Sequence, residues 1–164
     1  MSTLPPFEQV LDDHAATVLR VCVAHAGPQL ADEVFQETML AALRAYPDVR
    51  EAGAIRGWLC TIAMRKALDA HRASTRRPLP VDPAVLPEPP ARDAEPPGDP
   101  WPHVRALPPK QRAAVTLRFL GDLTHAEIGA VLGISADAAR RNVFEGLRAL
   151  RAAAPATPDL EPAR

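Results

Sequence analysis

The sequence has few cysteines and lacks the residue patterns on which many enzymes and metal sites depend. Its 164 residues include two cysteines, and its five histidines are scattered without paired ligand spacing, so we expect neither a disulfide framework nor a metal site. A glycine-rich phosphate loop and a nucleophile with a neighbouring base are both missing from the sequence. We therefore expect no enzyme activity, no catalytic residues and no cofactor.

Long apolar segments are missing too. No apolar run approaches the roughly 18 residues that span a bilayer. The N-terminus, MSTLPPFEQV, lacks the basic start and apolar centre of a signal peptide. These absences predict a cytoplasmic protein with no membrane partner. Cys22 and Cys60 each lie in an apolar helical pattern, which predicts free and mostly buried thiols.

A net excess of positive charge is also absent, since 19 Lys and Arg stand against 20 Asp and Glu, a net charge of −1. Taken whole, this balance looks wrong for a nucleic-acid binder. A sum near zero can nevertheless hide segments of opposite sign. The net charge is zero over residues 1–77, −4 over 78–102, +4 over 103–151 and −1 over 152–164. We expect these segments to be a helical domain, an acidic linker, a basic helical domain and a disordered tail.

Proline is abundant in one part of the chain, where 12 of the 19 prolines lie between Pro78 and Pro109. Proline lacks a backbone donor and restrains the residue before it, so residues 78–102 are expected to hold neither helices nor strands. A semi-extended linker of roughly 25 to 30 residues reaches on the order of 80 Å. The sequence therefore predicts two small domains on a long tether.

Helical periodicity fills the first domain, and no alternating strand pattern appears anywhere, which predicts an all-α protein. Apolar side chains recur at helical spacing in three stretches, separated by Gly27-Pro28 and by the loop YPDVREAGAIRG. Trp58, at the start of the third stretch, is expected to lie in the core rather than to stack on a base. The expected helices cover about residues 7–25, 29–45 and 55–72.

The second domain is expected to contain a helix-turn-helix motif. A helix beginning at LPPKQR ends at Gly121, and Thr124 and Glu127 have the spacing of a capping box before a short helix. The turn Gly133-Ile134-Ser135 then leads into a longer helix from Ala136 to about Arg151. The expected buried stripe of that helix consists of Ala139, Val143, Leu147 and Leu150.

The opposite face of this last helix carries candidate DNA contacts. At about 100° per residue, Arg141, Phe144 and Arg148 project away from Val143, with Arg140 on the flank. Guanidinium groups there could pair with guanine edges or with phosphates in a major groove, and an exposed aromatic ring could meet thymine methyl groups. Ordinary solvated charges are the alternative interpretation of these arginines.

Two strings in the sequence resemble a known family. ADEVFQETMLAALRAY followed by GWLCTIAMRKALDAHR resembles region 2 of sigma-70-type transcription initiation factors, and LPPKQRAAVTLRFLGDLTHAEIGAVLGISADAARRNVFEGLRALR resembles region 4. With two such domains and a linker, the chain is similar to the small extracytoplasmic-function (ECF) subfamily. The resemblance implies a factor that binds core RNA polymerase and directs promoter-specific transcription initiation.

The resemblance also implies partners and sites. Region 2 would grip the β′ clamp of polymerase and capture unpaired minus-ten bases, region 4 would read the minus-thirty-five element and pack on the β flap, and an anti-sigma factor would be a further partner. Polymerase contact is then placed on Asp32, Glu33, Gln36 and Glu37. Minus-ten contact is placed on the loop from Asp48 to Gly57, which includes Arg56, and on Arg65, Lys66, Asp69 and Arg72. Minus-thirty-five contact is placed on Arg118, Arg140, Arg141, Phe144 and Arg148.

The chain departs from the family pattern at three places that bear on which promoter is read. Arg65 stands where Asn is common, residues 137–142 read DAARRN instead of the usual GTVKSR, and Glu145 occupies a position that is frequently basic. Two alternatives to a sigma factor remain at this point. One is a DNA-binding regulator that keeps the fold without recruiting polymerase, and the other is a protein-interaction module that binds an anti-sigma factor.

Overall fold

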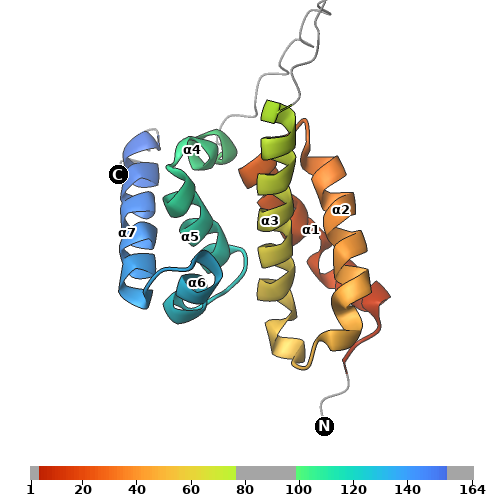
Figure 1. The fold of residues 1–164 in the computed structure, drawn as a ribbon. Helices are drawn as coiled ribbons and strands as arrows, with labels where there is room; N and C mark the ends of the chain where they lie inside the picture. Colours follow the sequence, from red (N-terminus) through yellow and green to blue (C-terminus); the bar gives the residue numbers. More distant parts are fainter. Residues whose placement is uncertain (1–3, 77–98, 155–164) are drawn as a thin grey trace, which may run out of the picture.

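The structure, a computed structural model, describes residues 4–76 and 99–154. All regular secondary structure in these two ranges is helical, as the periodicity predicts (Figure 1). Residues 77–98, which include most of the predicted acidic linker, and the predicted tail from residue 155 lie outside the described residues. None of the helices in the described part of the chain is both long and apolar enough to cross a membrane.

The first domain consists of three helices, α1 (Phe7–Ala26), α2 (Ala31–Ala45) and α3 (Ile55–Arg76), which pack against one another. The three predicted helices are confirmed, and α3 continues four residues beyond its predicted end. Helix α1 ends at Gly27, which has a positive φ of 81°. Glycine suits this position because residues with a side chain rarely adopt a positive φ. Two short 3₁₀ turns, Tyr46–Asp48 and Ala52–Ala54, connect α2 to α3.

The core of the first domain is built from small and branched side chains. Val18, Val21 and Leu59 are fully buried, and burial of each such side chain contributes about 1.5–3 kcal/mol. Cys22 and Cys60 are free and buried, as predicted. Burial raises the pKa of the Cys22 thiol to about 12 and that of Cys60 to about 11, so both stay protonated at neutral pH.

The second domain contains four helices, α4 (Trp101–Ala106), α5 (Pro109–Phe119), α6 (His125–Leu132) and α7 (Ala136–Ala153). Helix α4 was not predicted, and its first two residues fall in the segment assigned to the linker. Pro102 lies within its first turn, where backbone N–H groups have no intrahelical partner and a missing donor does no harm. The Asp99 carboxylate accepts a hydrogen bond from the Trp101 N–H at 3.1 Å and so satisfies one of these donors.

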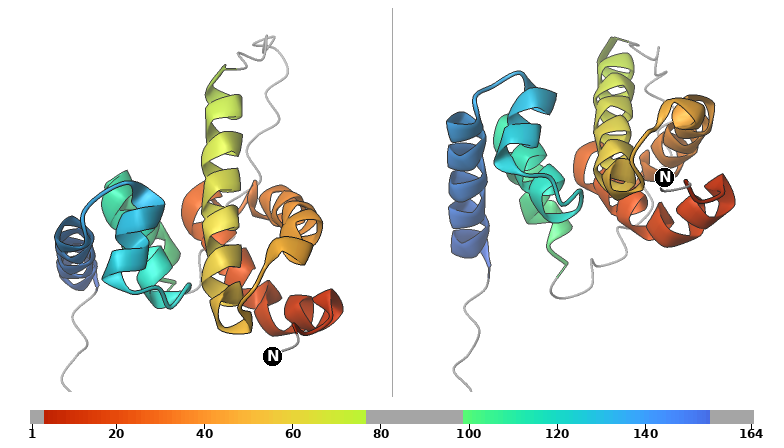
Figure 2. Two further views of the ribbon diagram at one scale, coloured as in Figure 1. Left: turned by 60° about the horizontal axis from the view of Figure 1, so that its bottom comes forward. Right: turned by 90° about the horizontal axis from the view of Figure 1, so that it is seen from below.

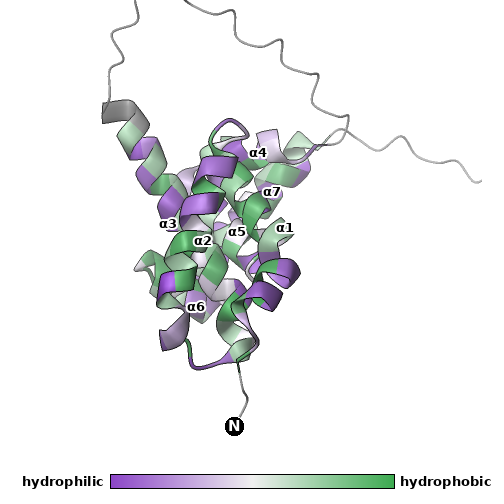
Figure 3. Cartoon of the chain, turned by 90° about the vertical axis from the view of Figure 1, so that its right-hand side faces the viewer, coloured by the Kyte–Doolittle hydropathy of each residue, from purple (hydrophilic) through white to green (hydrophobic). Residues whose placement is uncertain are grey.

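The two domains lie side by side, with α1 and α3 of the first domain against α4 and α5 of the second (Figure 2). Hydrophobic and hydrophilic residues alternate along the helices, as expected for amphipathic elements packed into a common core (Figure 3). Val21, Leu59 and Leu117 belong to one contiguous buried cluster that continues from the first domain into the second. The sequence predicts a tether between separate domains but contains no signal for this direct contact.

Candidate nucleic-acid and polymerase interfaces

The helix-turn-helix motif is formed by α6, a three-residue turn and α7. Gly133 adopts a positive φ of 67° at the end of α6, and the Ile134 N–H donates to the Gly129 carbonyl at 2.9 Å. The Ser135 hydroxyl caps α7 by accepting a hydrogen bond from the Ala138 N–H at 3.1 Å. The turn is therefore held by a backbone hydrogen bond on one side and by a side-chain cap on the other, which fixes the direction in which α7 leaves it.

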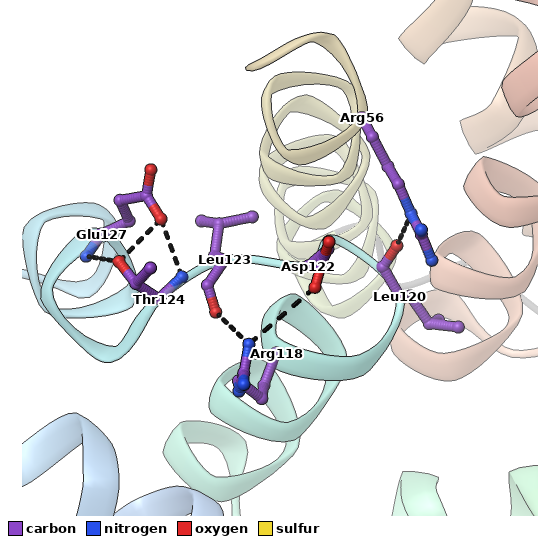
Figure 4. A network of polar contacts seen from close by, with 7 residues as sticks. All are labelled: Arg56, Arg118, Leu120, Asp122, Leu123, Thr124 and Glu127. Carbon is purple, nitrogen blue, oxygen red and sulfur yellow. Dashed lines mark hydrogen bonds and ion pairs between the residues drawn. The ribbon is translucent and has the colours of Figure 1, made fainter. Parts of the chain in front are cut away.

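The predicted capping box at the start of α6 is confirmed (Figure 4). The Thr124 N–H donates to the Glu127 carboxylate at 2.7 Å, and the Thr124 hydroxyl accepts from the Glu127 N–H at 3.3 Å. The hydrogen bonds from the Thr124 hydroxyl and N–H lower the pKa of Glu127 below its usual value. This contribution to α6 is therefore present at neutral pH and is lost as the pH falls through the lowered pKa of Glu127.

Helix α7 presents the predicted face to solvent. Ala139 and Val143 are buried, whereas Phe144 is 62% exposed. Gly146 allows close packing of α7 on α5, because a Cβ atom there would lie 2.6 Å from Val115 Cγ2. Leu147 and Leu150, expected in the buried stripe, are half-buried. All four α7 side chains that were predicted to contact DNA are exposed, namely Arg140, Arg141, Phe144 and Arg148.

The two acidic residues that interrupt the basic pattern of α7 have different partners. Asp137 Oδ1 accepts from Arg140 Nη2 at 2.8 Å, and both side chains are more than two-thirds exposed. Glu145 instead accepts from Gln111 Nε2 of α5 at 3.1 Å. The carboxylate of Asp137 therefore pairs with Arg140 on the exposed face of α7, whereas that of Glu145 is held against the neighbouring helix.

Replacing Asp137 by asparagine is expected to tighten binding to duplex DNA by about fivefold. This corresponds to about 1 kcal/mol, the energy between two unit charges about 4 Å apart in water. The same change should slightly lower the thermal stability of the second domain, because Asp137 lies in the first turn of α7 and favours the helix dipole. Fluorescence anisotropy and thermal unfolding measure the two effects, with Asp12→Asn on α1 as control. Weaker DNA binding by the Asp137 variant would contradict the expectation.

Arg118, at the end of α5, points into the turn between α5 and α6 (Figure 4). Arg118 Nη1 donates to the Leu123 carbonyl at 3.1 Å and lies 3.9 Å from Asp122 Oδ1. Asp122 has a positive φ of 59°, which allows the tight turn. In this conformation Arg118 stabilises the turn before the helix-turn-helix motif, and its side chain remains partly exposed.

The structure brings predicted polymerase-binding and minus-ten residues of the first domain into one groove between α2 and α3. Lys66 Nζ lies 3.4 Å from Glu37 Oε2 across the groove. Glu33 and Asp69 also line this groove, which has a volume of about 230 Å³. Asp69 Oδ1 lies 3.8 Å from Arg72 Nη1. Of the other predicted residues on these helices, Asp32, Gln36 and Arg65 are exposed.

A second hollow, of about 360 Å³, lies beside the loop between α2 and α3. It is lined by the side chains of the loop residues Asp48, Val49 and Arg50 and by Trp58. Trp58 is half-buried and packs on Tyr46, with ring centroids 6.4 Å apart. Trp58 packs against the buried core, as predicted, but it also lines the hollow, so the prediction that it lies in the core is only partly right.

Among the residues predicted to contact minus-ten DNA, Arg56 has a hydrogen-bond partner that the sequence did not indicate. Its Nε donates to the carbonyl of Leu120, in the second domain, at 2.7 Å (Figure 4). His25 of α1 is buried, and burial together with the positive charge of Arg112 lowers its pKa to about 4. His25 is therefore neutral at pH 7.

Within residues 4–76 and 99–154, no three His, Cys, Asp or Glu side chains are grouped as metal ligands.

Comparison with known families agrees with this arrangement of two helical domains, the second with a helix-turn-helix motif. The model of Sigma-70 region 2 matches residues 10–77, and that of Sigma-70, region 4 matches residues 104–150. Two domains of these kinds in this order define a sigma-type transcription initiation factor. The chain belongs to the sigma-70 family, in its ECF subfamily.

Relatives and solved structures are consistent with this membership. The ECF RNA polymerase sigma factor SigD of Mycobacterium tuberculosis is 33% identical over 159 residues, which cover 87% of this chain and 74% of SigD. SigE of Mycolicibacterium smegmatis is 29% identical over 160 residues, and the match covers 92% of this chain but only 62% of SigE. The chain therefore spans less than two thirds of SigE.

Two solved structures share the fold. The sigma factor RpoE from Bartonella quintana, solved with the anti-sigma factor NepR, has a TM-score of 0.68 at 16% identity, covering 89% of this chain and 94% of RpoE. CnrH, solved with the cytosolic domain of CnrY, has a TM-score of 0.60 at 21% identity, covering 90% of this chain and 86% of CnrH. At these identities the likeness concerns the fold alone.

Proposed function

We propose that this chain is an alternative sigma factor that binds core RNA polymerase and directs it to a specific set of promoters. The observation that carries the proposal is the presence of region 2 and region 4 in one chain, with the recognition helix α7 exposed. Such a factor works by binding and positioning, so the chain needs no catalytic residues and no cofactor of its own. It acts in the cytoplasm, where polymerase and promoter DNA meet.

Region 4 reads the minus-thirty-five element in this proposal. Arg140, Arg141 and Arg148 are exposed on α7, where a helix in the major groove presents its side chains to base edges and phosphates. Phe144 is placed to meet thymine methyl groups, and Arg118 to hold the DNA backbone beside the turn. The carboxylates of Asp137 and Glu145 lower the net charge of this face, so the isolated domain binds DNA weakly.

Region 2 captures the melted minus-ten element. Its hollow beside Trp58 is largely apolar and open, which suits a flipped base stacked on an aromatic ring. Arg65, Lys66 and Arg72 on α3 supply positive charge for the phosphates, and Arg56 lies at the start of the same helix. Asp69 Oδ1 lies 3.8 Å from Arg72 Nη1, and both side chains are exposed on the surface of α3.

Polymerase binds the acidic residues at the start of α2. Asp32, Glu33, Gln36 and Glu37 are all exposed and lie within two turns of one helix, where they can pair with basic groups on the β′ clamp. Region 4 packs on the β flap. The two solved structures of similar fold each contain a second protein, an anti-sigma factor in the case of RpoE, which supports an anti-sigma factor as a further partner of this chain.

Transcription in vitro with purified core polymerase tests the proposal directly. Genomic fragments should give discrete transcripts that depend on adding the chain. Co-purification with core polymerase separates the alternatives. A regulator that keeps the fold without recruiting polymerase binds DNA but does not co-purify, and an interaction module does neither. Absence of any promoter-specific transcript from the folded chain would refute the proposal.

Neutralising the acidic start of α2 is expected to weaken polymerase binding. The variant Asp32→Asn with Glu33→Gln should bind core polymerase at least tenfold less tightly, because exposed charges at an interface steer association and fix its register. The loss should shrink at high salt, where screening already weakens the charges of the unmodified chain. Asp12→Asn with Asp13→Asn removes two exposed charges from α1 and is the control. Equal affinity of the two variants would remove this surface from the proposed interface.

A further inference from the structure

The start of the described chain packs beside the loop between α2 and α3, at the same end of the first domain (Figure 1). The hydroxyl of Tyr46, the residue that follows α2, donates to the Pro5 carbonyl at 2.5 Å, across 41 positions of sequence. The helical hydrogen bonds of α1 begin one residue later, where the Pro6 carbonyl accepts from the Val10 N–H. The Pro5 carbonyl is therefore available to a side chain. This bond joins the N-terminal segment, residues 4–7, to the end of α2.

Aromatic rings continue this contact to the wall of the minus-ten hollow, the hollow of about 360 Å³ beside the loop. The ring of Tyr46 meets that of Phe7 edge to face, with centroids 5.3 Å apart and an interplanar angle of 67°. It also packs on the ring of Trp58, with centroids 6.4 Å apart. Both distances lie in the range in which aromatic pairs attract one another. Of these three rings, that of Trp58 lines the hollow, so the other two act on the hollow through it.

Tyr46 also begins the loop whose side chains line the hollow. Within the loop, the Val49 N–H donates to the Tyr46 carbonyl at 3.1 Å and closes the first 3₁₀ turn. Such a bond is local, so it shapes the turn but does not fix the loop relative to the helices. The side chain of Tyr46 supplies that link, because its partners Pro5 and Phe7 belong to a distant part of the sequence.

We propose that the N-terminal segment positions the minus-ten hollow through Tyr46. Tyr46 and Phe7 hold the Trp58 ring and the start of the loop in the shape that receives an unpaired base. Both are positioning residues, since it is Trp58 and the loop that line the hollow. This role rests on the proposed function of the hollow in capturing a minus-ten base. The contacts that hold Trp58 do not depend on that function.

A hollow that is already formed binds a base more tightly than one that must be ordered on binding. Immobilising loops and side chains at an interface costs affinity, and holding them beforehand removes that cost. Pro5 and Pro6 suit this role, because their fixed φ angles leave the segment little conformational freedom to lose. Positioning by this segment should therefore raise the affinity for unpaired minus-ten DNA and leave the affinity for core polymerase unchanged.

A double-mutant cycle between protein and DNA tests the proposal. The holoenzyme, formed from the full chain and core polymerase, is titrated with a single strand that carries the minus-ten element of a promoter found by transcription in vitro. Each base of the element is removed in turn by an abasic nucleotide, and fluorescence anisotropy measures the affinity. Loss of the captured base should weaken binding to the unmodified holoenzyme at least about fivefold, the lower limit for a stacked base.

Tyr46→Phe keeps the ring and removes the hydroxyl that Pro5 accepts. The variant holoenzyme should bind the intact strand about twofold to tenfold less tightly, as expected for a lost hydrogen bond. At the captured position the abasic effect should shrink to about twofold or less, because the two changes remove the same interaction. Phe7→Leu should act alike, since it removes the edge-to-face partner of Tyr46. Both variants should bind core polymerase as tightly as the unmodified chain.

Thr38→Val is the matched control, since it removes a buried hydroxyl of the same domain that donates to the Val34 carbonyl within α2. The control should keep the full abasic effect. A full effect in Tyr46→Phe, or an equally reduced effect in the control, would overturn the positioning role of Tyr46. A full effect in Phe7→Leu alone would overturn the part of Phe7. If no abasic position weakens the unmodified holoenzyme, base capture by the hollow is refuted instead.

A measurement on the free chain decides the positioning of Trp58 whether or not the hollow captures a base. With Trp101→Phe, indole fluorescence comes from Trp58 alone, since the sequence has two tryptophans. In this background, acrylamide should quench about 1.5-fold more strongly after Tyr46→Leu, because a ring that has lost its neighbour opens more often. Thr38→Val should leave the quenching unchanged, and circular dichroism confirms that each chain remains helical. Equal quenching in all three chains would overturn the positioning of Trp58.

Discussion

Promoter-directed transcription is expected to fall by at least tenfold when Arg140 and Arg141 are both replaced by alanine. Each arginine that pairs with a base edge contributes about 1–3 kcal/mol to binding, which corresponds to about fivefold to 150-fold. Arg140 shares its guanidinium with Asp137 in the free chain, so Arg141→Ala alone should have the larger effect of the two single changes. In the unmodified chain both side chains are exposed, and neither change creates a cavity.

The salt dependence of DNA binding separates the roles of these arginines. The slope of log affinity against log salt should fall by about 1 for each arginine that binds a phosphate. An arginine that reads a base should instead relax the sequence preference at one position. Arg20→Ala, which removes an exposed arginine from α1, is the control and should leave transcription unchanged. Unchanged transcription in the Arg140, Arg141 double variant would remove these two side chains from the proposed minus-thirty-five contact.

Replacing Gly129 by alanine is expected to destabilise region 4 by at least about 1–3 kcal/mol, the usual cost of overpacking. Glycine to alanine inside a helix ordinarily stabilises by about 0.5–1 kcal/mol. Here the sign reverses, because the new Cβ atom would lie 2.7 Å from the Ile134 carbonyl oxygen and 3.2 Å from the Ala136 nitrogen. Both are backbone atoms, one in the turn and one at the start of α7, and cannot rotate away as the end of a side chain could.

Thermal unfolding followed by circular dichroism measures this effect. A loss of a few kcal/mol in a domain this small lowers the midpoint by roughly 5 to 20 °C. Gly53→Ala is the matched control and should change stability by less than about 0.5 kcal/mol, since a Cβ atom there meets nothing within 4 Å. DNA binding should fall with the Gly129 change even at low temperature, because the angle between α6 and α7 changes. A stability equal to that of the control would contradict the close packing of this turn.

Most helices could be predicted because their signals are local. Apolar residues at helical spacing identify α1, α2 and α3, and glycine or proline marks their ends. The Thr124 and Glu127 capping box was likewise visible, since both partners lie within one turn. Helix α4 escaped prediction because Pro100 and Pro102 indicate an extended chain, although proline is tolerated in a first helical turn.

The candidate site was predictable in part for the same reason. The outward positions of Arg140, Arg141 and Arg148 follow from the period of the helix, and their exposure agrees with it. The pairing of Lys66 with Glu37 did not follow, because it depends on how α2 and α3 pack. The position of Trp58 at the edge of the core and in the lining of the hollow also depends on packing, since a helical pattern does not say how fully neighbours cover a large ring.

The sequence by itself determined the all-α class, the helix-turn-helix motif, the family and the charge of each segment, since these depend on residues within a few turns of one another. Only the tertiary structure decided that the two domains meet and that Arg56 is directed at Leu120. The close approach of Leu123 to Gly57 joins residues more than sixty positions apart. A pattern along the chain cannot encode such a contact, because it depends on the shapes of two surfaces that exist only after each domain has folded.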